Sequence, residues 1–190
     1  MVQKKIFLSR ILDLMLVALF VLMIVVPSVR LQIMSTAQKV LLYTGLFNVS
    51  PSSKPSESTF SYNLSIRDTF GRVVDMERMR NKTLFINIWA SWCPPCIAEM
   101  SEITKLYQSV GEEVEFMMIS ADADQQKAKD WVQDNSFPIP VYFPIQLNSS
   151  LSYQSIPTTW VVDRTGKVAF KREGMAQYNT EIFKEFLLSL

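Results

Sequence analysis

Residues 86–100, INIWASWCPPCIAEM, decide the fold of this chain. They contain its only two cysteines, Cys93 and Cys96. The apolar residues before Cys93 predict a buried strand, and the residues after it predict a helix. A pair of thiols at the junction of a strand and a helix is typical of thiol–disulfide exchange.

Cys93 stands where the predicted helix begins. The unpaired N–H groups and the positive end of the helix dipole at that terminus stabilise a thiolate, which is the nucleophile in this chemistry. Pro94 and Pro95 fit the first helical turn, where proline loses no hydrogen bond. Cys96 lies one turn further on the same face and can close a disulfide or resolve a mixed one. We therefore expect an exposed, attacking Cys93 and a partly buried, resolving Cys96.

These residues resemble those of the thioredoxin superfamily, and within it the membrane-anchored, extracytoplasmic reductases of the TlpA, ResA and CcmG (DsbE) kind. The resemblance extends over residues 58–190. It implies a thioredoxin-like α/β fold for residues 59–190, with a central mixed sheet flanked by helices and a redox-active disulfide in place of a bound cofactor. The matching residues are the strand end at 87–92, Cys93-Pro94-Pro95-Cys96, Glu99, and Ile156-Pro157-Thr158-Thr159.

The resemblance also assigns roles near the dithiol. In cytoplasmic thioredoxins an acid that relays protons precedes the attacking cysteine in the strand, but this chain has Asn87 in that place, and an amide cannot titrate. Glu99 is the substitute that the resemblance implies, because the matching residue of ResA-like proteins tunes the cysteine pKa values and carries protons. The alternative is that Glu99 is a solvated residue on the helix surface.

Pro157 matches the cis proline of the superfamily, which faces the attacking cysteine. A cis bond turns the chain and lets Ile156 present its backbone to an extended partner peptide, as an added strand would. The alternative is an ordinary trans proline at the start of a strand. The residues expected to contact a protein substrate are Trp92, Pro94, Pro95, Ile156 and Pro157.

The cysteine pair has three other interpretations. The spacing alone is compatible with an inert structural disulfide. A zinc site needs about four Cys or His ligands, and the chain has 2 Cys and 0 His, so no metal site is expected. A peroxiredoxin would, by resemblance to that family, have Pro and Thr before its attacking cysteine, where this chain has the residues from Trp89 to Trp92.

The composition excludes further classes of function. A net charge of +1 over 190 residues provides no basic field for nucleic acid. The chain has only 5 glycines and no Gly-rich fingerprint, so a phosphate-cradling loop is not expected. The length suits one domain with an additional segment, and the sequence shows no internal repeat.

The N-terminal residues predict a membrane anchor. Residues 1–10 form a tail rich in Lys and Arg, and residues 11–27 are almost entirely apolar. A basic tail stays in the cytoplasm. We therefore expect a single-pass helix at 11–27 in the cytoplasmic (inner) membrane, with the thiols on the periplasmic or extracytoplasmic side. A cleaved signal peptide is the rival interpretation, although Val26-Pro27-Ser28 is a poor cleavage site.

Residues 28–58 connect the predicted anchor to the domain. Up to residue 50, apolar and polar residues follow one another at a loosely helical spacing. This amphipathic segment is expected either to lie on the outer leaflet or to pack on the domain or on a partner. Residues 50–58, SPSSKPSES, predict a polar linker.

Hydrophobic periodicity predicts the elements of the domain. The final helix is expected to begin at Asn179 or Thr180 and to turn Ile182, Phe183 and Leu187 inward together with Phe186. The strand–helix–strand order after residue 83 predicts a parallel pair of strands. Strands are expected at 60–66, 83–89, 114–121, 137–143, 160–162 and 167–171, and helices at 94–110, 124–135 and 180–190, with a short helix or turn at 148–154.

The expected function is the transfer of two electrons between the Cys93–Cys96 pair and a cysteine pair of another protein. By resemblance, the direction is reduction, one substrate is the haem-attachment pair of apocytochrome c during cytochrome c biogenesis, and the electrons come from a membrane protein of the CcdA or DsbD kind. Two alternatives stay open: an oxidant that forms disulfides, and a non-enzymatic adaptor that uses the fold to hold a partner.

Overall fold

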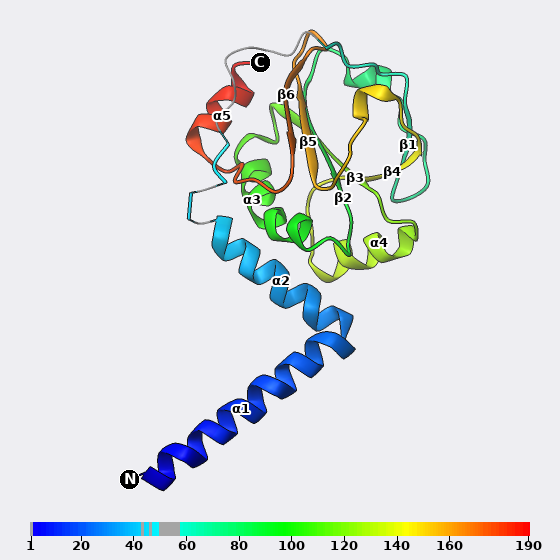
Figure 1. The fold of residues 1–190 in the computed structure, drawn as a ribbon. Helices are drawn as coiled ribbons and strands as arrows, with labels where there is room; N and C mark the ends of the chain where they lie inside the picture. Colours follow the sequence, from blue (N-terminus) through cyan, green and yellow to red (C-terminus); the bar gives the residue numbers. More distant parts are fainter. Residues whose placement is uncertain (1, 43, 46, 50–57) are drawn as a thin grey trace.

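The computed structural model describes every residue of the chain except 1, 43, 46 and 50–57. The linker predicted at 50–58 therefore lies outside the described residues, apart from Ser58. Two N-terminal helices, α1 (Val2–Val25) and α2 (Pro27–Leu42), precede an α/β domain (Figure 1).

A mixed sheet of six strands, counted over the described residues, forms the centre of that domain. The strands lie in the order β1-β4-β3-β2-β5-β6. β2, β3 and β4 run parallel to one another, whereas β1, β5 and β6 are antiparallel to their neighbours. The bounds are β1 (Ser65–Asp68), β2 (Thr83–Trp89), β3 (Val114–Ser120), β4 (Val141–Gln146), β5 (Thr158–Val162) and β6 (Val168–Glu173).

Alternate residues of the central strands bury different faces of the sheet, as the two-residue period of a strand requires. Phe85 and Trp89 of β2 pack with α3 (Pro94–Val110), α4 (Gln125–Asp134) and α5 (Glu181–Leu188) in one apolar cluster. Leu84, Ile86 and Ile88 pack in a second cluster with the segment from Phe60 to Met76, which has little regular structure. Figure 1 shows α3 and α5 on one side of the sheet and that segment on the other.

Each helix of the domain begins at a capping side chain. Cys93 caps α3, Asp124 caps α4 and Thr180 caps α5, and each accepts a hydrogen bond from a backbone N–H two or three residues further on. The choice between Asn179 and Thr180 is thereby decided for Thr180.

Two strands begin at least four residues later than the sequence predicts. The burial of Phe60, Tyr62 and Leu64 follows the predicted alternation, but their backbone bonds partly to turns, for example from the N–H of Phe60 to the carbonyl of Gly166, and β1 begins only at Ser65. β4 begins at Val141 and not at residue 137. The two prolines of the intervening stretch cannot donate to a ladder.

The prediction for Ile182 is wrong, since 64% of this residue is exposed. α5 packs through Phe183 and Leu187, which lie four residues apart and share a face. Successive residues of a helix are about 100° apart around its axis, so Ile182 points away from that face.

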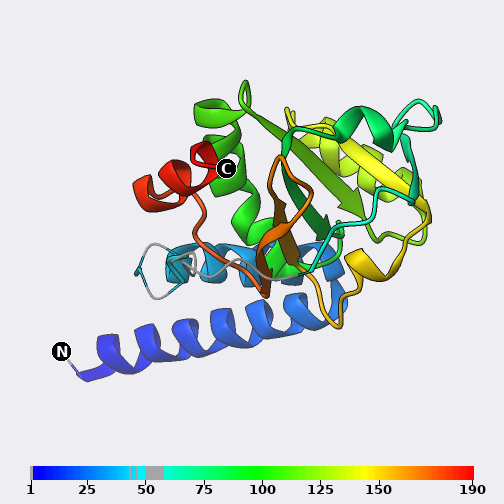
Figure 2. The same ribbon diagram turned by 90° about the horizontal axis from the view of Figure 1, so that it is seen from above.

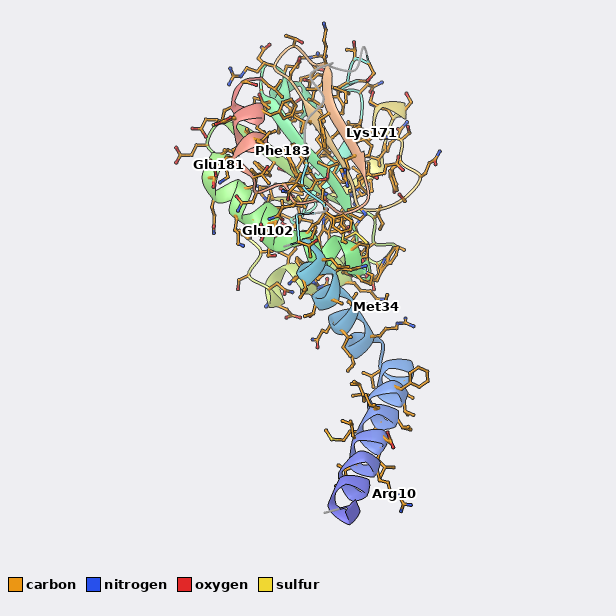
Figure 3. All side chains as sticks on the ribbon, turned by 60° about the vertical axis from the view of Figure 1, so that its left-hand side comes forward. Arg10, Met34, Glu102, Lys171, Glu181 and Phe183 are labelled. Atoms are coloured by element: carbon orange, nitrogen blue, oxygen red, sulfur yellow. A yellow bond between two sulfur atoms is a disulfide. The ribbon has the colours of Figure 1, made fainter. Side chains whose placement is uncertain are left out.

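α1 extends away from the domain and carries many exposed apolar side chains, with Leu14 70% and Phe20 65% exposed (Figure 3). Over the described residues, no helix has the combined length and apolarity that crossing a membrane requires. α2 instead lies against α3, with Ser35 and Leu42 buried. Of the two alternatives for residues 28–50, packing on the domain is the one observed for α2 (Figure 2).

A short pairing joins the residues after α2 to the C-terminal part of the domain. The N–H of Val49 donates to the carbonyl of Gln177, and the N–H of Gln177 donates to the carbonyl of Phe47 at 2.9 Å. Val49 is 3% exposed and belongs to the same apolar cluster as the two cysteines. The N-terminal segment is thus anchored on the domain at two places, α2 and residues 47–49.

Candidate functional site

The dithiol lies at the edge of the sheet where β2 ends. Cys93 and Cys96 are joined in a disulfide, so the structure describes the oxidised form. The backbone N–H of Cys96 donates to Cys93 Sγ at 3.3 Å, in the position of an N-cap bond. An N–H group aimed at this sulfur stabilises negative charge on it once the pair is reduced.

The peptide bond between Ile156 and Pro157 is cis, as predicted. β5 begins at the next residue, Thr158, which pairs with Ile88 of β2, so this loop lies at the same edge as the dithiol. Cys93 Sγ is 3.8 Å from the carbonyl oxygen of Ile156. The backbone of Ile156 therefore lies beside the sulfur that we expect to attack.

The expectation of an exposed Cys93 is wrong, since that residue is 3% exposed, and Cys96 is fully buried at 0% and not partly buried as expected. The sequence places Cys93 correctly at the helix start but does not reveal what packs on it. Its side chain belongs to an apolar cluster with Trp89 and Ala176, and with Val49 from the segment that precedes the domain.

Glu99 is 0% exposed, so the surface alternative is wrong. It lies on α3 one turn beyond Cys96. Its Oε1 accepts a hydrogen bond from Asn87 Nδ2 at 2.9 Å, and its Oε2 accepts one from the N–H of Ala176 at 3.0 Å. Asn87, which stands where cytoplasmic thioredoxins have their buried acid, thus binds an acid that comes from the helix.

Burial raises the pKa of Glu99 to about 8, although the hydrogen bonds from Asn87 and Ala176 and the charge of Arg172 act in the opposite direction. Loss of hydration therefore outweighs three stabilising contacts. A thiol titrates at about 8.5. A carboxyl with a pKa so close to that of a thiol can exchange a proton with it at little cost in free energy.

The hydrogen bonds continue beyond Asn87 into the core. Thr159 Oγ1 accepts from Asn87 Nδ2 at 2.9 Å and from the hydroxyl of Tyr178 at 2.8 Å. Burial, together with the charge of Glu99, raises the pKa of Tyr178 well above its usual value, so this hydroxyl stays protonated and donates. The result is a buried chain of contacts from Glu99 through Asn87 and Thr159 to Tyr178.

A second buried acid fixes the loop before the dithiol. Asp122 follows β3 and is 8% exposed. Its carboxylate accepts from the backbone N–H of Ser91 at 2.9 Å, from the Ser91 hydroxyl at 2.6 Å, and from the Ser120 hydroxyl at 2.9 Å. Since Ser91 is two residues from Cys93, these hydrogen bonds fix the loop that leads into α3.

The residues expected to contact a protein substrate differ in their exposure. Trp92 is 59% exposed, and Pro94, Pro95 and Ile156 are half-buried. Pro157 is buried. The structure thus brings Trp92, Pro94 and Ile156 to the surroundings of Cys93, and their contact with a substrate stays a prediction.

Several residues of the site were not singled out from the sequence. Asp122 could have been found, because polar residues at the carboxyl ends of neighbouring parallel strands meet at one edge. Thr159 belongs to the Ile-Pro-Thr-Thr run, but nothing in the sequence gave a signal that its hydroxyl accepts hydrogen bonds. Neither did Tyr178 or the N–H of Ala176, which reach the site only through the fold. Within the described ranges, no group of three or more Cys, Asp or Glu residues could hold a metal ion.

The chain is similar to known proteins. The Redoxin family model matches residues 55–181. The thiol-disulfide oxidoreductase ResA of Bacillus cereus (strain ATCC 10987 / NRS 248) is 28% identical over 160 residues, which cover 83% of this chain and 90% of ResA.

Solved structures show the same fold. The thioredoxin domain of a thiol-disulfide oxidoreductase from Bacteroides vulgatus superposes with a TM-score of 0.58 at 16% identity, covering 70% of this chain and 98% of that domain. StoA from Bacillus subtilis gives a TM-score of 0.51 at 18% identity, covering 72% of this chain and 98% of StoA.

The family match and the ResA relative agree on thiol–disulfide chemistry, and the solved structures share the fold. The chain belongs to the Redoxin family and is a thioredoxin-like protein disulfide oxidoreductase similar to ResA.

Proposed function

We propose that the chain reduces disulfides in partner proteins through Cys93 and Cys96. The observation that carries this proposal is the position of the dithiol, which lies at a helix N-terminus, opposite a cis proline loop, and one turn from the buried Glu99. These features supply a stabilised thiolate, a backbone edge for a partner strand, and a proton acceptor for the second thiol.

The reaction begins when the thiolate of Cys93 attacks one sulfur of the partner disulfide. A Cys93–partner disulfide forms, and the other partner sulfur leaves as a thiolate and takes a proton. The thiolate of Cys96 then attacks Cys93 Sγ, so that the Cys93–Cys96 disulfide forms and the second partner sulfur leaves. Two electrons pass from the enzyme to the partner.

Glu99 acts in the second step. Cys96 is fully buried, and its thiol must lose a proton before it attacks. Glu99, one turn away on the same face of α3, accepts that proton in its ionised form, which becomes populated as the pH approaches its pKa of about 8. The proton returns when the pair is reduced again.

We place the domain on the extracytoplasmic side of the cytoplasmic membrane, with α1 as its anchor. The exposed apolar side chains of α1 and the basic residues before them support this proposal. In an oxidising compartment the pair needs a supply of electrons, which a membrane dithiol protein of the CcdA or DsbD kind would provide. Apocytochrome c, with its paired haem-attachment cysteines, is the substrate that the resemblance to ResA-like proteins suggests.

The direction of transfer is tested by the reduction potential of the Cys93–Cys96 pair in the full chain, equilibrated with dithiothreitol buffers in detergent. We expect a value near that of thioredoxin, about −270 mV. A value near that of DsbA, about −120 mV, would show an oxidant and contradict the proposed direction.

The roles of the two cysteines are tested by replacing each with serine. We expect Cys93→Ser to abolish the reduction of insulin and Cys96→Ser to accumulate mixed disulfides, because the first lacks the nucleophile and the second lacks the resolving thiol. An adaptor would keep its partner and its cellular effect in the Cys93→Ser form.

A further inference from the structure

A groove of about 840 Å³ opens beside the dithiol, between α2 and α4. Leu31 and Met34 of α2 line one wall, and Trp131 of α4 lines the other. Trp92 and Pro94, the two sequence neighbours of Cys93, line the part next to the disulfide. The groove therefore begins at the reacting pair and continues along an N-terminal helix.

One wall of this groove lies outside the residues that the Redoxin model matches. The Redoxin match covers residues 55–181, whereas α2 ends at Leu42. α2 is nevertheless fixed on the domain, with its last residue 1% exposed. Figure 3 shows Met34 on α2, between the domain and the projecting α1.

The walls indicate the chemistry of an occupant. Met34 is 42% exposed and Trp92 is 59% exposed, so two large apolar side chains that line the groove face solvent. The charged groups of the groove are of both signs, with Arg30 and Lys127 balanced by two aspartates of α4. Such a site favours an apolar side chain over a strongly charged one.

The position of the groove identifies the occupant as polypeptide. A partner whose cysteine is bonded to Cys93 Sγ has its neighbouring residues within reach of Trp92 and Pro94. One side of that partner segment can pair with the backbone of Ile156, which lies beside the same sulfur. The other side then faces the groove.

We propose that α2 forms one wall of a binding site for the apolar side chain that adjoins the reacting cysteine of a partner polypeptide. This proposal rests on the proposed function, because it concerns the protein substrates of the same dithiol. It gives the segment between the predicted anchor and the domain a role in choosing substrates.

The test compares two disulfide-bridged peptides that differ only in the residues flanking their cysteines, leucine in one and serine in the other. The full chain is reduced, purified in detergent and mixed with each peptide, and the peptide dithiol formed is quantified by chromatography. We expect Met34→Glu to lower kcat/KM for the leucine peptide about tenfold, the order of one apolar contact in a pocket. For the serine peptide the change should stay below about twofold.

The matched control is Val40→Glu, which places the same charge on α2 at a residue that is 63% exposed and does not line the groove. It should leave both peptides unaffected. Leu31→Ala gives a second probe of the wall, without an added charge, and should weaken the leucine peptide selectively.

Equal effects of Met34→Glu on both peptides, or none on either, would overturn the proposal while the proposed function stands. The same holds if Met34→Glu only changes binding to lipid vesicles or association between copies of the chain. Failure of the unmodified chain to reduce either peptide would overturn the proposed function as well.

Discussion

At the scale of the residue, Glu99 shows how burial and hydrogen bonding compete. Two donors, Asn87 and the N–H of Ala176, bind its carboxyl group, yet the net effect is a pKa raised to about 8. The hydration free energy that the carboxylate loses on burial is larger than the free energy it regains from the two hydrogen bonds. A carboxyl group in this condition holds its proton through most of the physiological range and releases it near the pKa of a thiol.

This raised pKa predicts how stability changes with pH. The pKa of Glu99 is 4.5 in the unfolded chain and about 8 in the folded one, so between these values only the native state holds the proton. Stability is therefore complete below the lower value and falls as pH rises toward the upper one, with a slope of at most about 1.4 kcal/mol per pH unit. Glu99→Gln should abolish this part of the slope in urea unfolding of the oxidised chain at pH 5 to 8.

Glu102→Gln is the matched control for Glu99→Gln. Glu102 is another buried carboxylate of α3, but it is bound by Lys105 and by Gln177 and lies one turn further from the dithiol. Its replacement removes a buried carboxylate of the same helix without touching Asn87 or the N–H of Ala176, so a loss of slope confined to Glu99→Gln identifies Glu99 as its source. The same pair of variants, reduced, tests the proton role: Glu99→Gln should alter the pH profile of Cys93 alkylation, whereas an unaltered profile would refute that role.

The buried contacts around Thr159 predict an order of stabilities. Tyr178→Phe removes one donor and leaves Thr159 Oγ1 bonded to Asn87, so it should cost about 1 kcal/mol. Thr159→Val removes the acceptor of both and leaves two buried donors without it, so it should cost about 2–3 kcal/mol. Urea unfolding measures both, and equal costs would show that the chain of contacts does not act as one unit.

At the scale of the element, the sequence was sufficient wherever one physical pattern dominated. β2 is mostly apolar and became a central strand, and α3 begins directly after Cys93 because two prolines and a capping side chain agree on that start. β1 was predicted too early because burial alternates along residues 60–66 without a ladder to continue it. Alternation reports which side chains are buried, and not which backbone groups are paired.

The site was predictable to the extent that its residues are near one another in sequence. Cys93, Cys96 and Glu99 lie on one helix, so their proximity followed from helical spacing. The burial of Cys93 and the partners Ala176 and Tyr178 depend on segments distant in sequence, and no local pattern announces such contacts. For the same reason, the sequence left both alternatives open for α2.

Asp122, which follows β3, is predicted to stabilise the loop that follows β2. Because it accepts three hydrogen bonds, two of them from Ser91, Asp122→Ala should lower the free energy of unfolding by about 2–3 kcal/mol and loosen the loop before Cys93. Asp130→Ala, at a residue bonded by Gln126 on the surface of α4, should change it by less than about 0.5 kcal/mol. Urea unfolding compares them, and similar losses in both variants would contradict this role.

At the scale of the whole molecule, the exposed apolar side chains of α1 predict how the chain partitions. If α1 is an anchor, Leu16→Arg combined with Leu19→Arg should release the chain into the soluble fraction on carbonate extraction, because each charge at mid-membrane costs about 2.5–3.5 kcal/mol. Val40→Arg, on α2, should leave partitioning unchanged. Extraction of the unmodified chain by carbonate would refute the anchor.

The pairing of residues 47–49 with Gln177 connects the N-terminal segment to the C-terminal part of the domain. Gln177 directly follows Ala176, whose N–H binds Glu99. The bonds that fix the N-terminal segment and the bond that orients Glu99 are therefore one peptide bond apart. If α1 is held in a membrane, a force on the N-terminal segment and the protonation of Glu99 would act on neighbouring backbone groups, the carbonyl of Gln177 and the N–H of Ala176.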